Sequence, residues 1–198
     1  MSAAATRARK VRTAVLISGR GSNMMALVEA ARADDYPAEI VLVVSNRPKA
    51  AGLDKARGAG IAALAIDHTD YPDRAAFERA LHAALLEREV EFVACAGFMR
   101  VLTPWFVSRW AGRLINIHPS LLPKYKGLHT HRRALEAGDA QAGASVHWVV
   151  PEIDAGDVIA QVAVDIRPED TEDSLAARIL ERERTLYPDA LRRALTPR

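Results

Sequence analysis

The sequence predicts a single α/β domain built on a mixed β-sheet, mostly parallel, with helices on both faces. Three observations predict it. Short β-branched apolar segments alternate with segments of helical period over residues 11–137, which is typical of parallel βαβ units. Two late apolar segments have no helical segment between them, which predicts an antiparallel pair. No Pro/Gly-rich linker divides the 198 residues, a length that buries a full core.

The elements follow in order from these patterns. The clearest helix is 73–88, where Phe77, Leu81 and Leu85 share one stripe, and the last helix contains Pro188, where it can break. With right-handed connections, the pattern gives a Rossmann-like sheet. The predicted strands are 11–18, 39–45, 61–66, 92–96, 114–117, 144–150 and 158–164. The predicted helices are 24–33, 50–59, 73–88, 104–110, 130–137 and 171–195.

Composition narrows the function classes. The net charge of +2 gives no case for nucleic-acid binding, and no run of about 18 apolar residues is present to span a membrane. Cys95 is the only cysteine, which rules out an internal disulfide and argues against a cysteine metal site. Residues 1–10 read as a disordered basic leader; a targeting peptide is the alternative, although an apolar segment and a cleavage site are missing. We expect a cytoplasmic protein.

Polar groups cluster where predicted strands end, and ligands of open α/β sheets bind beyond the carboxyl ends of their strands. Residues 19–23, Gly-Arg-Gly-Ser-Asn, follow the first strand and open the first helix. Free N–H groups at a helix start favour an anion such as phosphate, and Ser22 or Asn23 can cap the helix or bond that anion. The segment lacks the third glycine of a dinucleotide fingerprint. A plain turn with a helix cap explains it too.

Asn116 and His118 form the strongest pattern. If residues 114–117 are a strand, these side chains share one face at its end, just before a loop interrupted by Pro119 and Pro123. An amide that donates to a developing oxyanion, beside an imidazole that moves a proton near neutral pH, suits acyl-type transfer. The alternative is a structural histidine.

Three further segments are less specific. The loop 97–100 follows the fourth strand and can line an apolar slot or simply pack on the next helix. His129 and His131 resemble a metal pair, but no cluster of cysteines or carboxylates accompanies them, so no metal is expected. The turn 151–157 carries three carboxylates. One that faced His118 would favour its protonated form, and the pattern does not say which one does.

Taken together, the motifs resemble the glycinamide ribonucleotide formyltransferases of purine biosynthesis, over residues 12–188. The segments that carry the resemblance are Ser18-Gly19-Arg20-Gly21-Ser22-Asn23, Ala96-Gly97-Phe98-Met99-Arg100, Asn116-Ile117-His118-Pro119-Ser120-Leu121-Leu122-Pro123, Gly127-Leu128-His129-Thr130-His131, Ser145-Val146-His147 and Asp154-Ala155-Gly156. On this basis we assign residues 11–198 to a formyltransferase domain. Ala155, Asp157 and Lys126 depart from the commonest residues of that family.

The resemblance implies transfer of a formyl group from 10-formyltetrahydrofolate, a consumed co-substrate, to the amino group of 5′-phosphoribosylglycinamide. Such an enzyme acts on small molecules, needs no metal, and is a monomer or homodimer. The implied catalytic residues are Asn116, His118 and Asp154. The implied binding residues for the phosphoribosyl substrate are Gly21, Ser22, Asn23 and Glu183. Those for the folate are Arg74, Met99, Arg100, Val101, Leu102, Asn116, Val150, Pro151, Glu152, Ile153 and Asp154. His147 also matches and reads as a structural or supporting residue.

Three alternatives remain open. The first is a 10-formyltetrahydrofolate hydrolase, which uses water as the acceptor. Close relatives of that hydrolase type carry an extra N-terminal regulatory domain, whereas this chain has about ten residues there. A transfer-RNA formyltransferase needs a C-terminal RNA-binding domain and a more basic surface. A non-catalytic sugar-phosphate binding protein would use the glycine-rich turn and leave Asn116 and His118 idle.

Overall fold

The computed structural model describes residues 9–196, so most of the predicted basic leader lies outside the described residues. The last two residues of that leader contact the domain. Arg9 forms an ion pair with Glu91 at 2.6 Å, and Lys10 Nζ donates to the Ala31 carbonyl at the end of α1. The strands are β1 (Val11–Ile17), β2 (Ala38–Ser45), β3 (Ala63–Ala65), β4 (Phe92–Cys95), β5 (Leu114–His118), β6 (Gln141–Trp148) and β7 (Val158–Asp165). The helices are α1 (Ser22–Ala31), α2 (Ala51–Gly58), α3 (Arg74–Glu87), α4 (Pro104–Arg109), α5 (Thr130–Glu136) and α6 (Glu172–Leu195), with a short 3₁₀ helix η1 (His68–Asp70).

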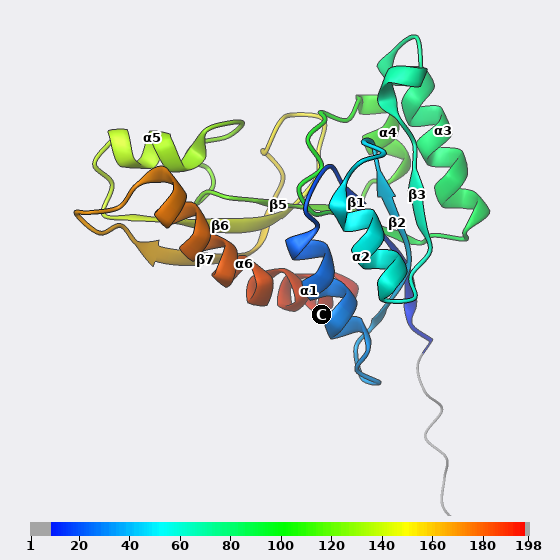
Figure 1. The fold of residues 1–198 in the computed structure, drawn as a ribbon, viewed down its shortest axis with the longest axis horizontal. Helices are drawn as coiled ribbons and strands as arrows, with labels where there is room; N and C mark the ends of the chain where they lie inside the picture. Colours follow the sequence, from blue (N-terminus) through cyan, green and yellow to red (C-terminus); the bar gives the residue numbers. More distant parts are fainter. Residues whose placement is uncertain (1–8, 197–198) are drawn as a thin grey trace, which may run out of the picture.

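The strands form one seven-stranded sheet in the order β3-β2-β1-β4-β5-β6-β7 (Figure 1). The first five are parallel, whereas β5 to β7 pair antiparallel, so the predicted mixed sheet is confirmed. From β1 the next two strands, β2 and β3, are added on one side, and β4 is then added on the other side of β1. In folds of this type ligands bind at such a reversal of strand order, beyond the carboxyl ends of the strands, here β1 and β4.

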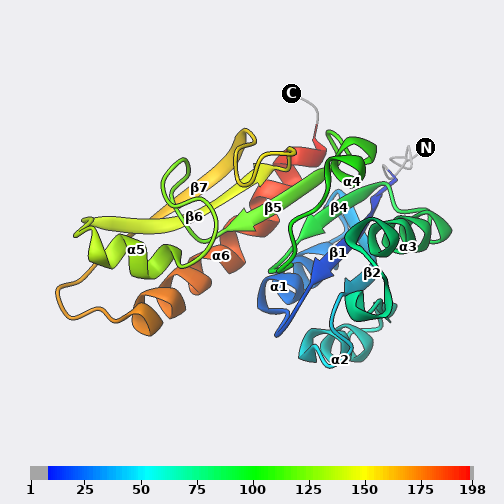
Figure 2. The ribbon, with the colours of Figure 1, turned by 90° about the horizontal axis from the view of Figure 1, so that it is seen from above.

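Alternating side chains divide the core between the two faces of the sheet. Val15 and Ile17 of β1 lie in the core cluster with α1, α2 and the C-terminal part of α6, whereas Ala14 and Leu16 lie in the cluster with α3 and α4. The two groups of helices flank the sheet in Figure 2. A third cluster joins α5 and the start of α6 to β6 and β7. Helices on both faces are therefore confirmed.

Where the antiparallel strands β6 and β7 extend the sheet, loops cover part of one of its faces. On β5, Ile115 and Ile117 pack into the α6-side cluster, so Asn116 and His118 point to the opposite face. The buried side chains of α3 and α4 cluster there with Leu114, at the start of β5. Further along that face, the segments 119–129 and 149–157 supply the neighbours of the polar side chains. The site thus lies under loops.

All the predicted strands and helices are present, with ends that differ by at most three residues, and η1 was not predicted. The predicted helix 171–195 is present as α6, unbroken from Glu172 to Leu195, so the break that Pro188 can cause does not occur. Proline costs a helix one hydrogen bond. Tyr187, Ala190 and Leu191 around it are fully buried, and Tyr36 donates to the Pro188 carbonyl at 2.8 Å. Tertiary packing therefore offsets the defect. None of the described helices is both long and apolar enough to cross a membrane.

His82 of α3 makes folding stability depend on pH. Its ring meets Trp105, Phe106 and Trp110 edge-on, with centroids 5.5 to 6.5 Å apart. Burial lowers the pKa of His82, and the nearby charges of Arg109 and Arg113 lower it further. The folded protein therefore prefers the neutral ring. The contribution of His82 to the free energy of unfolding is complete above the pKa of the unfolded state, near 6.5, and is lost as the pH falls through the lower pKa of the folded state.

We predict that the free energy of unfolding decreases from pH 7 to pH 5, and that His82→Phe flattens this decrease. Phenylalanine keeps the edge-on ring contacts but cannot take up a proton. Urea denaturation at a series of pH values measures the effect. Parallel curves for the wild type and the variant would show that His82 is not responsible.

Candidate functional site

His118 is held at both ring nitrogens at the carboxyl end of β5. The side chain is 8% exposed. Its Nε2 lies 2.9 Å from the carbonyl oxygen of Tyr125. Because a carbonyl only accepts, Nε2 carries the hydrogen in this contact. Its Nδ1 lies 3.3 Å from Oδ2 of Asp154. A ring with both nitrogens protonated therefore finds an acceptor on each side.

Asp154 reaches His118 from the turn between β6 and β7. Its backbone has a φ of 48°, in the left-handed region, and the N–H of Gly127 donates to its Oδ2 at 2.9 Å. Burial raises the pKa of Asp154, but hydrogen bonds from His147 and Gly127 and the charges of His118 and His147 together outweigh it, so the net shift is downward. The carboxylate is therefore ionised at neutral pH. Of the three acidic residues in this turn, Asp154 is the one that faces His118.

His147 connects Asn116 to the same carboxylate. In the β5–β6 register it lies opposite Asn116, and Ser145 lies opposite His118. Its Nδ1 lies 2.8 Å from the carbonyl of Trp148 and donates to it. Its Nε2 lies 3.3 Å from Asn116 Nδ2 and 3.5 Å from Asp154 Oδ1, so a neutral ring accepts from Asn116, whereas a protonated ring donates to Asp154. When the ring is neutral, one amide hydrogen of Asn116 is fixed and the other is available. The sequence analysis did not predict this contact. The signal that could have indicated it is the period-two spacing of Ser145 and His147, which places both on the same face of a strand.

The glycine-rich turn follows the carboxyl end of β1, the strand next to β4. Gly21, with a φ of 70°, occupies the position before α1 and has no side chain, so the predicted capping by Ser22 or Asn23 does not occur. The first N–H groups of a helix lack intrahelical acceptors, which leaves them to an anion. A Cβ on Gly52 of α2 would stand 3.0 Å from the Gly19 carbonyl, and Gly52 N–H donates to that oxygen at 3.0 Å. Gly52, which sequence reasoning missed, therefore lets α2 support the turn.

Glu183 of α6 lies beside this turn. Its carboxylate accepts from Asn23 Nδ2 at 2.7 Å, and the side chain is buried. Burial raises the pKa of Glu183, although the bond from Asn23 opposes this rise. The structure thus brings together two predicted substrate-binding residues that are 160 positions apart in the chain.

Ser18 organises the loop that follows β4. Its hydroxyl donates to Asn46 Oδ1 at 2.5 Å and accepts from the N–H of Met99 at 2.8 Å. In the sequence, Ser18 is only one member of a motif that carries the resemblance, and its contacts could not be predicted. Met99 and Val101 are exposed to 60% and 46%, and Ile153 of the other loop to 52%. Met99 and Val101 belong to the loop after β4, the strand next to β5, and Ile153 directly precedes Asp154 in the β6–β7 turn.

The other predicted folate residues are distributed as follows. Leu102 is buried in the α3–α4 cluster and does not offer its side chain to a ligand. Arg100 places its guanidinium 5.2 Å from the ring centroid of Phe77, and Arg74 begins α3 with an exposed side chain. Pro151 and Glu152 are exposed in the turn that carries Asp154, and Val150 precedes them half-buried.

His129 and His131 do not form a metal pair with other ligands within the described part of the chain. His129 precedes α5 with a φ of 58° and His131 lies within α5. Among residues 9–196, no group of three or more His, Cys, Asp or Glu side chains could hold a metal ion. Cys95 is a buried free thiol, and burial raises its pKa to about 12.

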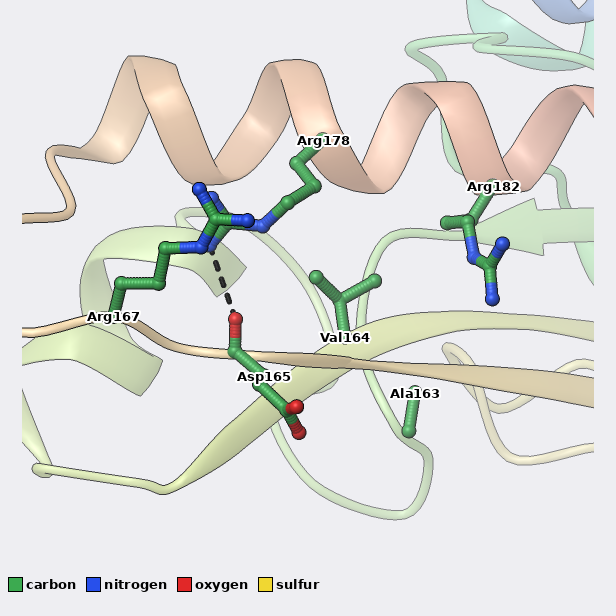
Figure 3. A pocket seen from close by; sticks show the side chains of 6 residues that line it. All are labelled: Ala163, Val164, Asp165, Arg167, Arg178 and Arg182. Carbon is green, nitrogen blue, oxygen red and sulfur yellow. Dashed lines mark hydrogen bonds between the residues drawn. The ribbon is translucent and has the colours of Figure 1, made fainter.

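A cavity of about 370 Å³ lies apart from these residues, between β7 and α6 (Figure 3). Arg178 donates there to the carbonyl of Asp165, the last residue of β7. It also forms an ion pair with Asp170. None of the predicted site residues lines this cavity. Its lining consists of Ala163, Val164, Asp165, Arg167, Arg178 and Arg182.

Comparison with known proteins agrees with this geometry. The sequence model of the family described as formyl transferase matches residues 11–191. The chain belongs to this family. It is 47% identical over 174 residues to phosphoribosylglycinamide formyltransferase of Escherichia coli K12, covering 88% of this chain and 82% of that protein. It is also 49% identical over 185 residues to the trifunctional purine biosynthetic protein adenosine-3 of Drosophila melanogaster, covering 92% of this chain. The chain spans only 14% of that protein's length.

Solved structures show the same fold. Phosphoribosylglycinamide formyltransferase from Brucella melitensis superposes with a TM-score of 0.91 at 45% identity, covering 96% of this chain and 98% of that one. Glycinamide ribonucleotide transformylase 1 from Symbiobacterium toebii gives a TM-score of 0.90 at 42% identity, covering 92% and 86%. The sheet and its antiparallel extension are therefore an architecture of formyltransferases.

We predict that Gly52→Ala lowers the free energy of unfolding by about 1–3 kcal/mol, because the added methyl would stand 2.4 Å from Cδ1 of the buried Ile17 and 3.0 Å from the Gly19 carbonyl oxygen, so that both the side chain and the turn must shift. Chemical denaturation measures the change. Gly58→Ala is the matched control: it lies in the same helix, its Cβ meets nothing within 4 Å, and helix propensity predicts equal or greater stability. Equal effects at the two positions would contradict the packing argument.

Proposed function

We propose that this chain transfers the formyl group of 10-formyltetrahydrofolate to the amino group of 5′-phosphoribosylglycinamide. The observation that carries the proposal is the convergence of an amide, an imidazole and a carboxylate from β5 and the β6–β7 turn. The same sheet carries, after β1, a helix start whose free N–H groups suit an anion. Support also comes from the relatives named phosphoribosylglycinamide formyltransferase, of which this chain covers most of the length.

The reaction requires an oxyanion to be stabilised. The amine attacks the formyl carbon, a tetrahedral oxyanion forms, and the folate nitrogen leaves with a proton. In our proposal Asn116 donates its free amide hydrogen to the oxyanion, while its other hydrogen is fixed by the neutral ring of His147 at 3.3 Å. A donor held in place before the reaction is what this type of stabilisation needs.

We assign His118 and Asp154 a joint role. With its two nitrogens facing the Tyr125 carbonyl and the Asp154 carboxylate, a protonated His118 places positive charge near the oxyanion without turning. Asp154, ionised because its pKa is lowered, balances that charge. For His118 to donate a proton to the leaving nitrogen, the ring must release one of these two acceptors. The geometry therefore favours charge stabilisation as its first contribution.

The remaining residues bind the two substrates in this proposal. The N–H groups after Gly21, at Ser22 and Asn23, hold the phosphate, and Glu183 contacts the ribose. Arg74, Arg100 and the side chains of residues 150–153 line the folate site, where exposed Met99, Val101 and Ile153 suit a flat apolar ring. Leu102 supports this loop from the core instead. We further propose a cytoplasmic enzyme, monomeric or homodimeric, that acts on small molecules.

We predict that purified protein releases tetrahydrofolate from 10-formyltetrahydrofolate only when 5′-phosphoribosylglycinamide is present, because the amine is the acceptor. A spectrophotometric assay of the folate with and without the nucleotide measures this directly. Equal release without the nucleotide would identify a hydrolase. No release in either condition would leave a binding protein and refute the proposal.

Substitutions separate the roles of the three residues. We predict that Asn116→Ala lowers kcat by about 10²–10³ through loss of an oxyanion donor. His118→Ala and Asp154→Ala should each lower it by about 10²–10⁴. Binding of the phosphorylated substrate, measured by calorimetry, should survive in all three variants because the glycine-rich turn is untouched. Near-normal turnover in any variant would refute the role assigned to that residue.

A further inference from the structure

The loop 124–129 holds both charged groups of the proposed site through its backbone. The Tyr125 carbonyl accepts from His118 Nε2 at 2.9 Å, and the Gly127 N–H donates to Asp154 Oδ2 at 2.9 Å. Two residues of one short loop thus fix the imidazole and the carboxylate relative to each other. Any shift of this loop changes the distance between His118 and Asp154.

The backbone of this loop is unusual. Tyr125, Gly127 and His129 have φ values of 55°, 80° and 58°, so every second residue lies in the left-handed region. Residues other than glycine rarely adopt this conformation, and it persists where neighbouring contacts determine it. The loop therefore needs external support to keep its carbonyl and N–H groups aimed at the site.

One side chain supplies much of that support. Arg133 of α5 donates from Nη1 to the Lys126 carbonyl at 2.7 Å and more weakly to the Leu128 carbonyl at 3.4 Å. Its guanidinium carbon also lies 5.0 Å from the ring centroid of Tyr125. The two carbonyls flank Gly127, and the ring belongs to the residue that binds His118. Arg133 thus contacts the loop on both sides of the N–H group that binds Asp154.

Asp139, just after α5, anchors the other end of the loop. Its carboxylate accepts from the Tyr125 hydroxyl at 2.7 Å and from Lys124 Nζ at 2.9 Å. These bonds fix the ring of Tyr125 in the position where Arg133 stacks on it. The loop is therefore held between Asp139 and a planar guanidinium, both belonging to the same short segment of chain.

We infer that Arg133 is a positioning residue for the reaction: by binding the carbonyls of Lys126 and Leu128 and stacking on Tyr125, it holds His118 and Asp154 in register. The inference rests on the proposed function. Arg133 does not itself reach the reacting groups; it acts through the loop. Its planar, five-donor side chain suits this task, and lysine cannot both fork and stack in the same way.

The next residue on α5 provides a matched control. Arg132 is also an exposed arginine of the same helix, but it pairs with Glu172 at 3.0 Å, away from the loop. Arg132→Gln and Arg133→Gln therefore remove the same charge from the same helix. Only the second removes the contacts to residues 125–128.

The first measurement is steady-state kinetics of the transfer reaction. We expect Arg133→Gln to lower kcat about 10-fold or more while both KM values change less than about 2-fold, because misplacement of reacting groups affects the chemical step. Arg133→Lys should fall in between, and Arg132→Gln should match the wild type. An Arg133→Gln variant with wild-type kcat, or one whose loss is equalled by Arg132→Gln, overturns the inference.

A second measurement does not depend on turnover. Hydrogen exchange at the Gly127 amide reports directly on its bond to Asp154, and we expect it to quicken about 10-fold in Arg133→Gln but not in Arg132→Gln. The exchange of core amides, such as those of β1, should not change. Unaltered Gly127 exchange in Arg133→Gln overturns the inference. If the wild type has no transferase activity but Gly127 exchange still quickens, the proposed function fails while the loop contact stands.

Discussion

The ionised carboxylate of Asp154 is the constraint on which the rest of the site depends. It comes from a turn with left-handed backbone and lies between His118 Nδ1 at 3.3 Å and the Gly127 N–H at 2.9 Å. Within the same turn, Gly156 is indispensable, because a Cβ there would stand 1.8 Å from the Trp148 carbonyl. A negative charge in this half-buried place accepts a hydrogen bond from the Gly127 N–H and is further stabilised when the neighbouring histidines are protonated. Without it, a charged His118 would lose its partner.

The fold explains why such a cluster can form at this point. Parallel strands with covering helices normally bury both faces of a sheet. Here the antiparallel strands β6 and β7 extend the sheet beyond α4, and polar side chains of β5 and β6 occupy one face there. Loops cover this face, so the polar groups are shielded from water. The glycine-rich turn and the groups proposed for formyl transfer follow the carboxyl ends of β1 and β5, which lie on either side of β4.

Much of this arrangement could be predicted from the sequence. Alternation of strand and helix patterns gave the parallel sheet, and period two placed Asn116 and His118 on one face. The continuity of α6 through Pro188 could not be predicted, since it depends on burial of Tyr187 and Leu191 against distant strands. The same holds for Gly52, Ser18 and Arg133, whose neighbours are brought close only by folding. Among the acidic residues of the last turn, the residue pattern alone did not distinguish Asp154; the family resemblance did, and the structure places its carboxylate against His118.

A double-mutant cycle on kcat tests the central claim that His118 and Asp154 act as one unit. The variants are His118→Ala, Asp154→Asn and the two combined. If the pair acts jointly, the double variant should turn over no more than about 3-fold more slowly than the slower single variant, because the second substitution removes nothing further. If instead the two losses multiply in the double variant, the residues act independently and this account is wrong.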